Sequence, residues 1–226
     1  MTRAQIANRF ARGLLVCNDA VIFTDADEFL VADPAKYAGL PEYLCDRRDR
    51  EVLAPLALEV MHNAKFEPAL DPTRPLLEQR GLVRFSPGMC KPLIKRSPQP
   101  WEPAFHAIHA PFEVDPALWM LHLKYSDEHV LETVAEHRRR IYEQEGRGHR
   151  RSFWPMGAEA LKGRLSSWTG VAQDVEAVPE FDPAEVDLEG LIGEVREGVW
   201  RSRANQVAAL ETTPLRRLPQ RFRSIF

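Results

Sequence analysis

Val21-Ile22-Phe23-Thr24-Asp25-Ala26-Asp27-Glu28-Phe29-Leu30 joins an apolar run directly to two aspartates that are one residue apart. Valine, isoleucine and phenylalanine favour an extended, at least half-buried backbone, so residues 20–24 are predicted to form a strand. If the backbone stays extended, Asp25 and Asp27 point to the same side. Two carboxylates this close repel each other, so a divalent cation or a shared proton is expected between them. The alternative is an aspartate-rich turn that only ends the strand.

The composition limits the class of protein. The 226 residues are enough for one domain with a helical appendage, and a hydrophobic share of 44% is typical of a globular chain. The net charge of −3 gives no reason to expect a nucleic-acid partner. Three widely spaced cysteines favour reduced thiols over a disulfide framework. With no apolar run of membrane-spanning length and no signal peptide, the expected location is the cytoplasm.

Hydrophobic periodicity predicts the order of the elements. Residues 2–16 have apolar positions at four-residue spacing, which predicts an amphipathic helix ahead of strand 20–24. Residues 52–61 are predicted to form an interior strand, in which Pro55 indicates a bulge or an edge. Residues 62–88 contain four prolines and are predicted to form a long loop. Further strands are expected at 89–96 and 118–125, and further helices at 127–145, 156–168 and 184–211.

Four segments, taken together, resemble one known family. Asp25-Ala26-Asp27-Glu28-Phe29 resembles the long form of the DxD motif in GT-A-type glycosyltransferases of the family-2-like kind. The later segments expected of such enzymes follow in the same order: Lys91-Pro92-Leu93-Ile94, Phe105-His106 and Leu121-His122-Leu123-Lys124-Tyr125. The resemblance covers residues 1 to about 142.

The resemblance implies a fold class and a division of the chain. The expected fold is α/β, with the Rossmann-like mixed sheet of the GT-A class flanked by helices. We expect residues 1–150 to form the catalytic core and residues 151–226 to form a helical extension. The family keeps much of its nucleotide pocket ahead of the DxD strand, where this chain has about one helix. The core is therefore expected to be short at its N-terminal side.

The resemblance also implies a reaction and its cofactor. It predicts a metal-dependent hexosyltransferase that moves a sugar from a nucleotide-sugar donor to a glycan acceptor, as in polysaccharide biosynthesis. The cofactor would be Mn²⁺ or Mg²⁺, which neutralises the diphosphate leaving group. Asp25, Asp27 and His122 are the expected metal site, with Asp27 as the direct ligand. For His122 the alternative is a core histidine that is bonded to a carbonyl group.

The substrate contacts are predicted from residue type and position. Lys91 and Lys124 are candidates for binding phosphate oxygens. Trp101 and His106 are candidates for the acceptor sugar, which can stack on an aromatic face. An ordered loop without a ligand is the alternative for His106. The general base cannot be identified from the sequence.

Two carboxylates are candidates for the general base by position only. They are Asp115, ahead of strand 118–125, and Asp127, which is also expected to cap helix 127–145. The basic tail over 215–223 has apolar residues between its arginines, which suits either a membrane or protein contact or a solvated terminus. The oligomeric state is left open.

Two other functions fit parts of the pattern. One is a glycosyltransferase-like protein that binds its ligand without catalysis. The other is a haloacid-dehalogenase-like phosphatase, in which the first aspartate of a similar motif is the nucleophile. That family has threonine or valine at the position of Phe29 and a later acidic pair for Mg²⁺, whereas this chain has no Asp-Asp dipeptide. The pattern therefore fits the phosphatase less well.

Overall fold

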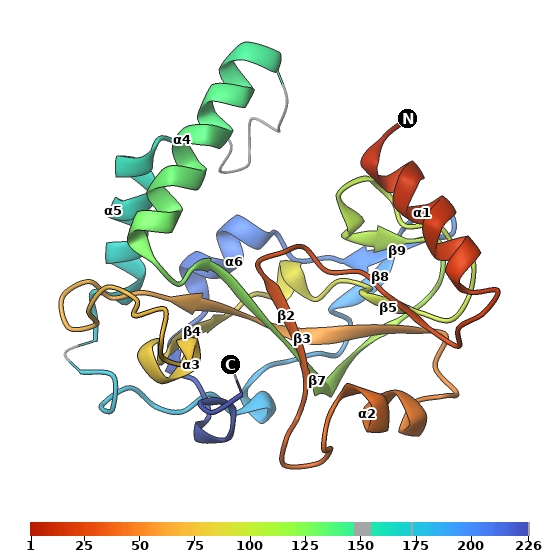
Figure 1. Cartoon of the computed structure of the whole chain (residues 1–226), viewed down its shortest axis with the longest axis horizontal. Coiled ribbons are helices and arrows are strands. Elements are labelled where there is room, and N and C mark those ends of the chain that lie inside the picture. The colour runs from red at the N-terminus through yellow and green to blue at the C-terminus, as the bar shows by residue number, and fades with distance from the viewer. Residues whose placement is uncertain (147–154, 173, 226) are drawn as a thin grey trace. The chain divides into compact units, whose positions relative to one another are not determined.

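Helices and strands alternate along the chain, so the α/β class is confirmed (Figure 1). The computed structural model describes residues 1–146, 155–172 and 174–225. These residues form two compact units, each assembled from three separate segments. The first unit comprises Met1–Leu58, Phe85–Leu121 and Pro183–Leu210, and the second comprises Glu59–Arg84, His122–Asp182 and Glu211–Phe226. The boundary expected at residue 150 falls within 147–154, outside the described residues.

The first unit holds most of the strands. Its elements are α1 (Arg3–Leu14), β1 (Val21–Ile22), β2 (Glu28–Ala32), α2 (Leu40–Asp46), the start of β3 (Val52–Met61), η1 (Pro87–Met89), β5 (Ile94–Lys95), η2 (Pro103–Phe105), β6 (Ala107–Ile108), the start of β7 (Glu113–Tyr125), η3 (Pro183–Glu185), β8 (Ile192–Arg196), β9 (Val199–Ser202) and the start of α6 (Gln206–Thr212). The strand order is β1-β5-β3, while β7 pairs with both β2 and β3. A separate three-stranded sheet has the order β6-β9-β8.

The second unit is richer in helix. It contains the ends of β3, β7 and α6, together with α3 (Leu76–Gln79), β4 (Leu82–Phe85), α4 (Glu128–Glu145), α5 (Ala158–Thr169), β10 (Leu215–Arg217) and η4 (Gln220–Phe222). In the strand order β4 lies between β3 and β10. Helices α4 and α5 lie side by side (Figure 1). Asp127 caps α4 by accepting hydrogen bonds from the backbone N–H groups of His129 and Val130, as its sequence position predicts.

The strand before the aspartates is shorter than expected. Only Val21 and Ile22 are paired in β1, which stands at the end of the strand order beside β5. The backbone then turns, and the N–H of Glu28 donates to the carbonyl of Asp25 at 3.1 Å. The extended backbone predicted through Asp25 and Asp27 is therefore wrong, because this hydrogen bond closes a turn between β1 and β2. The interior strand predicted at 52–61 is confirmed as β3, which is buried along its whole length.

The region expected to be a long loop contains a buried strand. Within 62–88, Leu82-Val83-Arg84-Phe85 forms β4, and the short helix α3 precedes it. This strand has only four residues, and a run of that length is too short for hydrophobic periodicity to distinguish it from a loop. The pairing partner is distant in sequence: Leu215 of β10 lies opposite Arg84, and Arg217 lies opposite Leu82.

The C-terminal part is not wholly helical. The helix predicted over 184–211 is replaced by the hairpin of β8 and β9, followed by the short helix α6. Gly198 lies in the turn of the hairpin with φ of +69°, a conformation in which glycine avoids the steric cost of a side chain. The solvated tail is also wrong for residues 215–222, because β10 is paired and Leu218 and Phe222 are buried.

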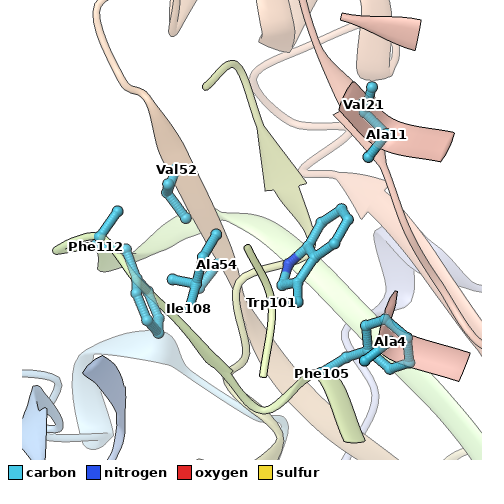
Figure 2. Packing of buried hydrophobic residues seen from close by; sticks show 10 residues of the cluster. Ala4, Ala11, Val21, Val52, Ala54, Trp101, Phe105, Ile108 and Phe112 are labelled. Carbon is cyan, nitrogen blue, oxygen red and sulfur yellow. The ribbon is translucent and has the colours of Figure 1, made fainter. Parts of the chain in front are cut away.

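Aromatic and small side chains together form the core of the first unit. Figure 2 shows Trp101 and Phe105 of the η2 region beside Ala4 of α1, with Val52 and Ala54 of β3 nearby. Phe23, just before the acidic turn, stacks on Phe105 with ring centroids 4.0 Å apart. Burial of these rings fixes the segment before the turn against the 101–105 segment, which contributes several kcal/mol by area alone, about 25 cal/mol per Å².

We predict opposite effects for one substitution at two exposed glycines. Gly198→Ala forces a side chain into the left-handed region and is expected to lower the free energy of unfolding by about 1 kcal/mol. Gly163→Ala lies inside α5 with open space around it and is expected to raise that free energy by a similar amount. Urea denaturation measures both. Equal effects of the two changes would contradict the hairpin turn.

Candidate functional site

The acidic segment between β1 and β2 is held in shape by its own residues. The Oε2 of Glu28 accepts a hydrogen bond from the backbone N–H of Asp25 at 3.1 Å. In return, the backbone N–H of Glu28 donates to the carbonyl oxygen of Asp25. Asp27 and Glu28 each present a carboxylate oxygen, and these two atoms lie within 4.8 Å of each other. Glu28 is buried and Asp27 is half-buried. The turn therefore holds several carboxylates in a partly desolvated environment, where their negative charge is costly unless cations lie nearby.

Two cations of the first unit supply part of that compensation. The Nζ of Lys91 lies 2.6 Å from the Oε1 of Glu28 and 4.0 Å from the Oδ2 of Asp25. Lys91 is 1% exposed, so this is a buried ion pair. The Nη2 of Arg3, on α1, lies 3.0 Å from the Oδ1 of Asp25. Three carboxylates and two cations leave these five side chains with one net negative charge.

His106 lies near the same charges and is held as a neutral imidazole. Its Nδ1 is 3.1 Å from the carbonyl oxygen of Gly88; a carbonyl only accepts, so Nδ1 carries the proton. Burial and the charge of Lys91 together lower the pKa of His106 to about 4, and Asp25 opposes the shift. The preceding Ala104 and Phe105 both have positive φ, at +68° and +62°, which is uncommon outside glycine. Such strain is often found at functional sites.

Trp101 is placed differently from the role expected of it. Only 3% of the residue is exposed, and its Nε1 donates to the carbonyl oxygen of Pro92 at 2.6 Å. The Nζ of Lys95 lies 3.8 Å from the centroid of the ring. Little of the ring is left for a sugar to stack on, so Trp101 mainly supports the core. Arg3 lies over the ring of Phe105 instead, at 4.9 Å from its centroid.

Two of the residues predicted for the metal and substrate sites belong to the second unit. His122 on β7 is buried, and its Nδ1 lies 2.7 Å from the Oε2 of Glu59 on β3. A buried carboxylate therefore lies beside the imidazole of His122. Lys124 is half-buried, with its Nζ 4.6 Å from the ring centroid of Tyr125. The first unit holds the other predicted residues of the metal and substrate sites, namely Asp25, Asp27, Lys91, Trp101 and His106.

The two candidates for the general base both have structural partners. Asp115 accepts hydrogen bonds from the Nε of Arg47, the hydroxyl of Tyr43 and the N–H of Ala117. Burial would raise the pKa of Asp115, but these hydrogen bonds outweigh it and lower the pKa. Asp127 caps α4 and lies 3.6 Å from the Nη2 of Arg80. A carboxylate with a lowered pKa is a weak base, which makes Asp115 a poor candidate.

Sequence reasoning missed Arg3 and Glu59. Glu59 carries a recognisable signal, because it is the only charged residue in the apolar run of β3 and a buried charge needs a partner. Arg3 carries no such signal, since an arginine on an amphipathic helix is usually solvated. Only the packing of α1 against the η2 region brings it to Asp25.

Comparisons of the chain with protein-family models, with curated proteins and with solved structures give no match. Among the described residues, no helix combines the length and the apolar character that crossing a membrane would require.

We predict that the pair of Lys91 and Glu28 is strongly coupled. Lys91→Met leaves the Glu28 carboxylate buried without its cation and is expected to cost about 3–5 kcal/mol of unfolding free energy. Adding Glu28→Gln removes the stranded charge and should recover most of that loss. Urea denaturation of both single variants and the double variant measures the coupling. Lys36→Met, at an exposed lysine, is the control, and additive losses would argue against a buried pair.

We also predict that His106 makes stability depend on pH. Its folded pKa of about 4 lies below the ordinary value of 6.5, so the unfolded chain binds the proton first and stability falls as pH falls through this range. Relative to His106→Gln, the wild type should lose about 2 kcal/mol between pH 7 and 4.5. Denaturation at both pH values tests this. The exposed His129 supplies the control variant His129→Gln. Parallel pH profiles for wild type and His106→Gln would contradict the prediction.

Proposed function

We propose that this protein is a metal-dependent glycosyltransferase of the GT-A type that uses a nucleotide-sugar donor. The observation that carries the proposal is the folded acidic turn, in which Asp27 and Glu28 bring carboxylate oxygens within 4.8 Å beside a buried lysine. This turn is formed by the Asp-Ala-Asp-Glu-Phe segment that carries the family resemblance. A cytoplasmic location and a glycan acceptor are part of the same proposal.

The donor atoms suit a hard divalent cation. Carboxylate oxygens are the preferred ligands of Mg²⁺ and Mn²⁺, and the net negative charge of the turn and its two cations favours binding one more cation. Asp27 is the proposed direct ligand. Asp25 is already paired with Arg3, so we assign it a supporting role. When bound, the cation would neutralise the diphosphate leaving group.

The other groups near the turn have separate proposed roles. Lys91 fixes Glu28 from a buried position, so it shapes the turn and its charge helps to hold His106 neutral. The side chain of Arg3 is 65% exposed and can turn toward the negative phosphates of a donor. A neutral His106 with its proton on Nδ1 presents a lone pair on Nε2, which can accept a hydrogen bond from an acceptor hydroxyl.

Asp27→Asn tests the proposal. The wild-type chain is expected to bind Mn²⁺ in calorimetry, and the variant is expected to bind at least tenfold more weakly, about 1.4 kcal/mol, because a neutral amide replaces the ligand. Asp49→Asn is the matched control at an exposed aspartate and should bind like wild type. A panel of UDP- and GDP-sugars is then assayed with Mn²⁺ for transfer or hydrolysis. Mn²⁺ binding that is equal in all three proteins would contradict the proposed site.

A non-catalytic glycosyltransferase-like binding protein is the second candidate. It is favoured by the structural partners of Asp115 and Asp127, because neither carboxylate is positioned by those contacts to remove a proton. Metal-dependent binding of a nucleotide sugar without hydrolysis or transfer to any glycan acceptor would support this candidate over the enzyme.

A further inference from the structure

Helix α1 presents an apolar side to solvent. Nine large apolar side chains are exposed among the described residues, and six of them belong to residues 1–22. Three of these six, Ile6, Phe10 and Leu14, recur at four-residue spacing and so lie on one side of α1. Phe10 is 70% exposed and Ile6 is 53% exposed. Single exposed apolar residues are ordinary, but a group of them on one surface marks an interaction site.

The apolar side of α1 continues into an open groove of the first unit. The groove has a volume of about 330 Å³ and is lined by α1, by residues 21–23 and by Trp101, all of them in that unit. The buried sides of α1 and β1 meet the same core through Ala11 and Val21 (Figure 2). β1 stands at the end of its strand order, and Ile22 is 40% exposed there. The apolar surface therefore extends from the helix to the edge strand.

Basic side chains accompany this surface. Residues 1–18 contain Arg3, Arg9 and Arg12 but neither aspartate nor glutamate. Arg9 follows Ile6 by three positions, so the two lie next to each other on the helix. Arg9 and Arg12 are exposed, and within the described part of the chain neither is paired with a carboxylate. The segment thus joins exposed apolar groups to positive charge that is not neutralised.

We propose that α1 docks the first unit on an anionic lipid surface. In this arrangement Ile6, Phe10 and Leu14 enter the headgroup region, while the long side chains of Arg9 and Arg12 contact lipid phosphates. The negative surface of the bilayer attracts the arginines, and the apolar side chains leave water. This peripheral contact goes beyond the proposed glycosyltransferase activity and does not depend on it.

A second copy of the chain suits the same surface less well. Around a twofold axis the same residues face each other, so two copies would bring their unpaired arginines together. Residues 1–18 contribute no carboxylate to offset that repulsion. Lipid phosphates carry the complementary sign. Charge complementarity therefore favours the lipid surface over self-association.

Vesicle sedimentation with the full chain tests the proposal. We expect the wild type to sediment with vesicles of phosphatidylcholine and phosphatidylglycerol in equal parts, and to bind vesicles of phosphatidylcholine alone much more weakly. Phe10→Ser should lower the partition coefficient by about tenfold, because a large apolar side chain is lost from the interface. Arg9→Gln combined with Arg12→Gln should lower it by about tenfold as well, because two attractive charges are lost.

Matched controls change equivalent groups elsewhere on the surface. Val171→Ser removes another exposed apolar side chain, and Arg48→Gln combined with Arg74→Gln removes the same amount of charge. Both control proteins should bind vesicles like the wild type. Because Phe10 is exposed, Phe10→Ser should also keep the unfolding free energy of the wild type in urea denaturation. Equal losses of vesicle binding in the variants of α1 and in the controls would overturn the proposal.

A thiol of the chain can report whether this surface meets the lipid. Cys17 is exposed and follows Leu14 by three residues, just beyond the end of α1. A polarity-sensitive dye is attached to Cys17 in a protein with Cys45→Ser, which removes the other exposed thiol. We expect its emission to shift to the blue with anionic vesicles, and the shift to be lost when Phe10→Ser is added. An unchanged emission in the protein without Phe10→Ser would overturn the proposed contact.

Sedimentation velocity examines the alternative occupant. A wild-type dimer that Phe10→Ser converts to a monomer, without vesicle binding, would assign the surface to a second copy and overturn the proposal. Absence of wild-type binding to both kinds of vesicle would overturn it too. Neither result bears on the proposed metal site, because Phe10→Ser is expected to bind Mn²⁺ like the wild type.

Discussion

The buried ion pair between Lys91 and Glu28 is the interaction on which the first unit's candidate site depends. A lysine that is 1% exposed cannot remain charged without a partner, and Glu28 provides one at 2.6 Å. The same carboxylate accepts from the backbone of Asp25, so one side chain joins the segment at residue 91 to the shape of the acidic turn. The buried charge of Lys91 requires the Glu28 carboxylate at this position. This requirement stabilises the shape of the turn, which positions Asp27.

Strain and burial arrange the segment opposite the turn. Ala104 and Phe105 adopt left-handed backbone conformations that cost about 1–3 kcal/mol each, and the packing of Phe105 against Phe23 offsets this cost. The strain brings His106 to the carbonyl of Gly88, where it is half-buried and neutral. An imidazole that stays neutral beside a lysine can accept a hydrogen bond at pH values where an ordinary histidine would be partly charged.

The acidic residues of the chain fall into two groups with different partners. Asp115 and Asp127 are engaged by several donors each, and these contacts hold α2 to β7 and cap α4. Glu28 and Glu59 are more deeply buried, and each lies close to a cation or an imidazole from a distant segment, Lys91 at 2.6 Å and His122 at 2.7 Å. Several convergent donors indicate a structural role.

The sequence by itself determined the elements whose signals are local. Helices α1, α4 and α5, the buried strand β3 and the cap at Asp127 follow from periodicity, length and residue type over a few turns. The Asp25-Ala26-Asp27-Glu28-Phe29 segment also identified the acidic turn. Tertiary structure alone decided the pairing of β4 with β10, the hairpin where a helix was predicted, and the burial of Trp101. It also supplied Arg3 and Glu59 as partners of Asp25 and His122. The physical reason is that short strands and ion pairs gain their stability from residues tens of positions away, which no local pattern records.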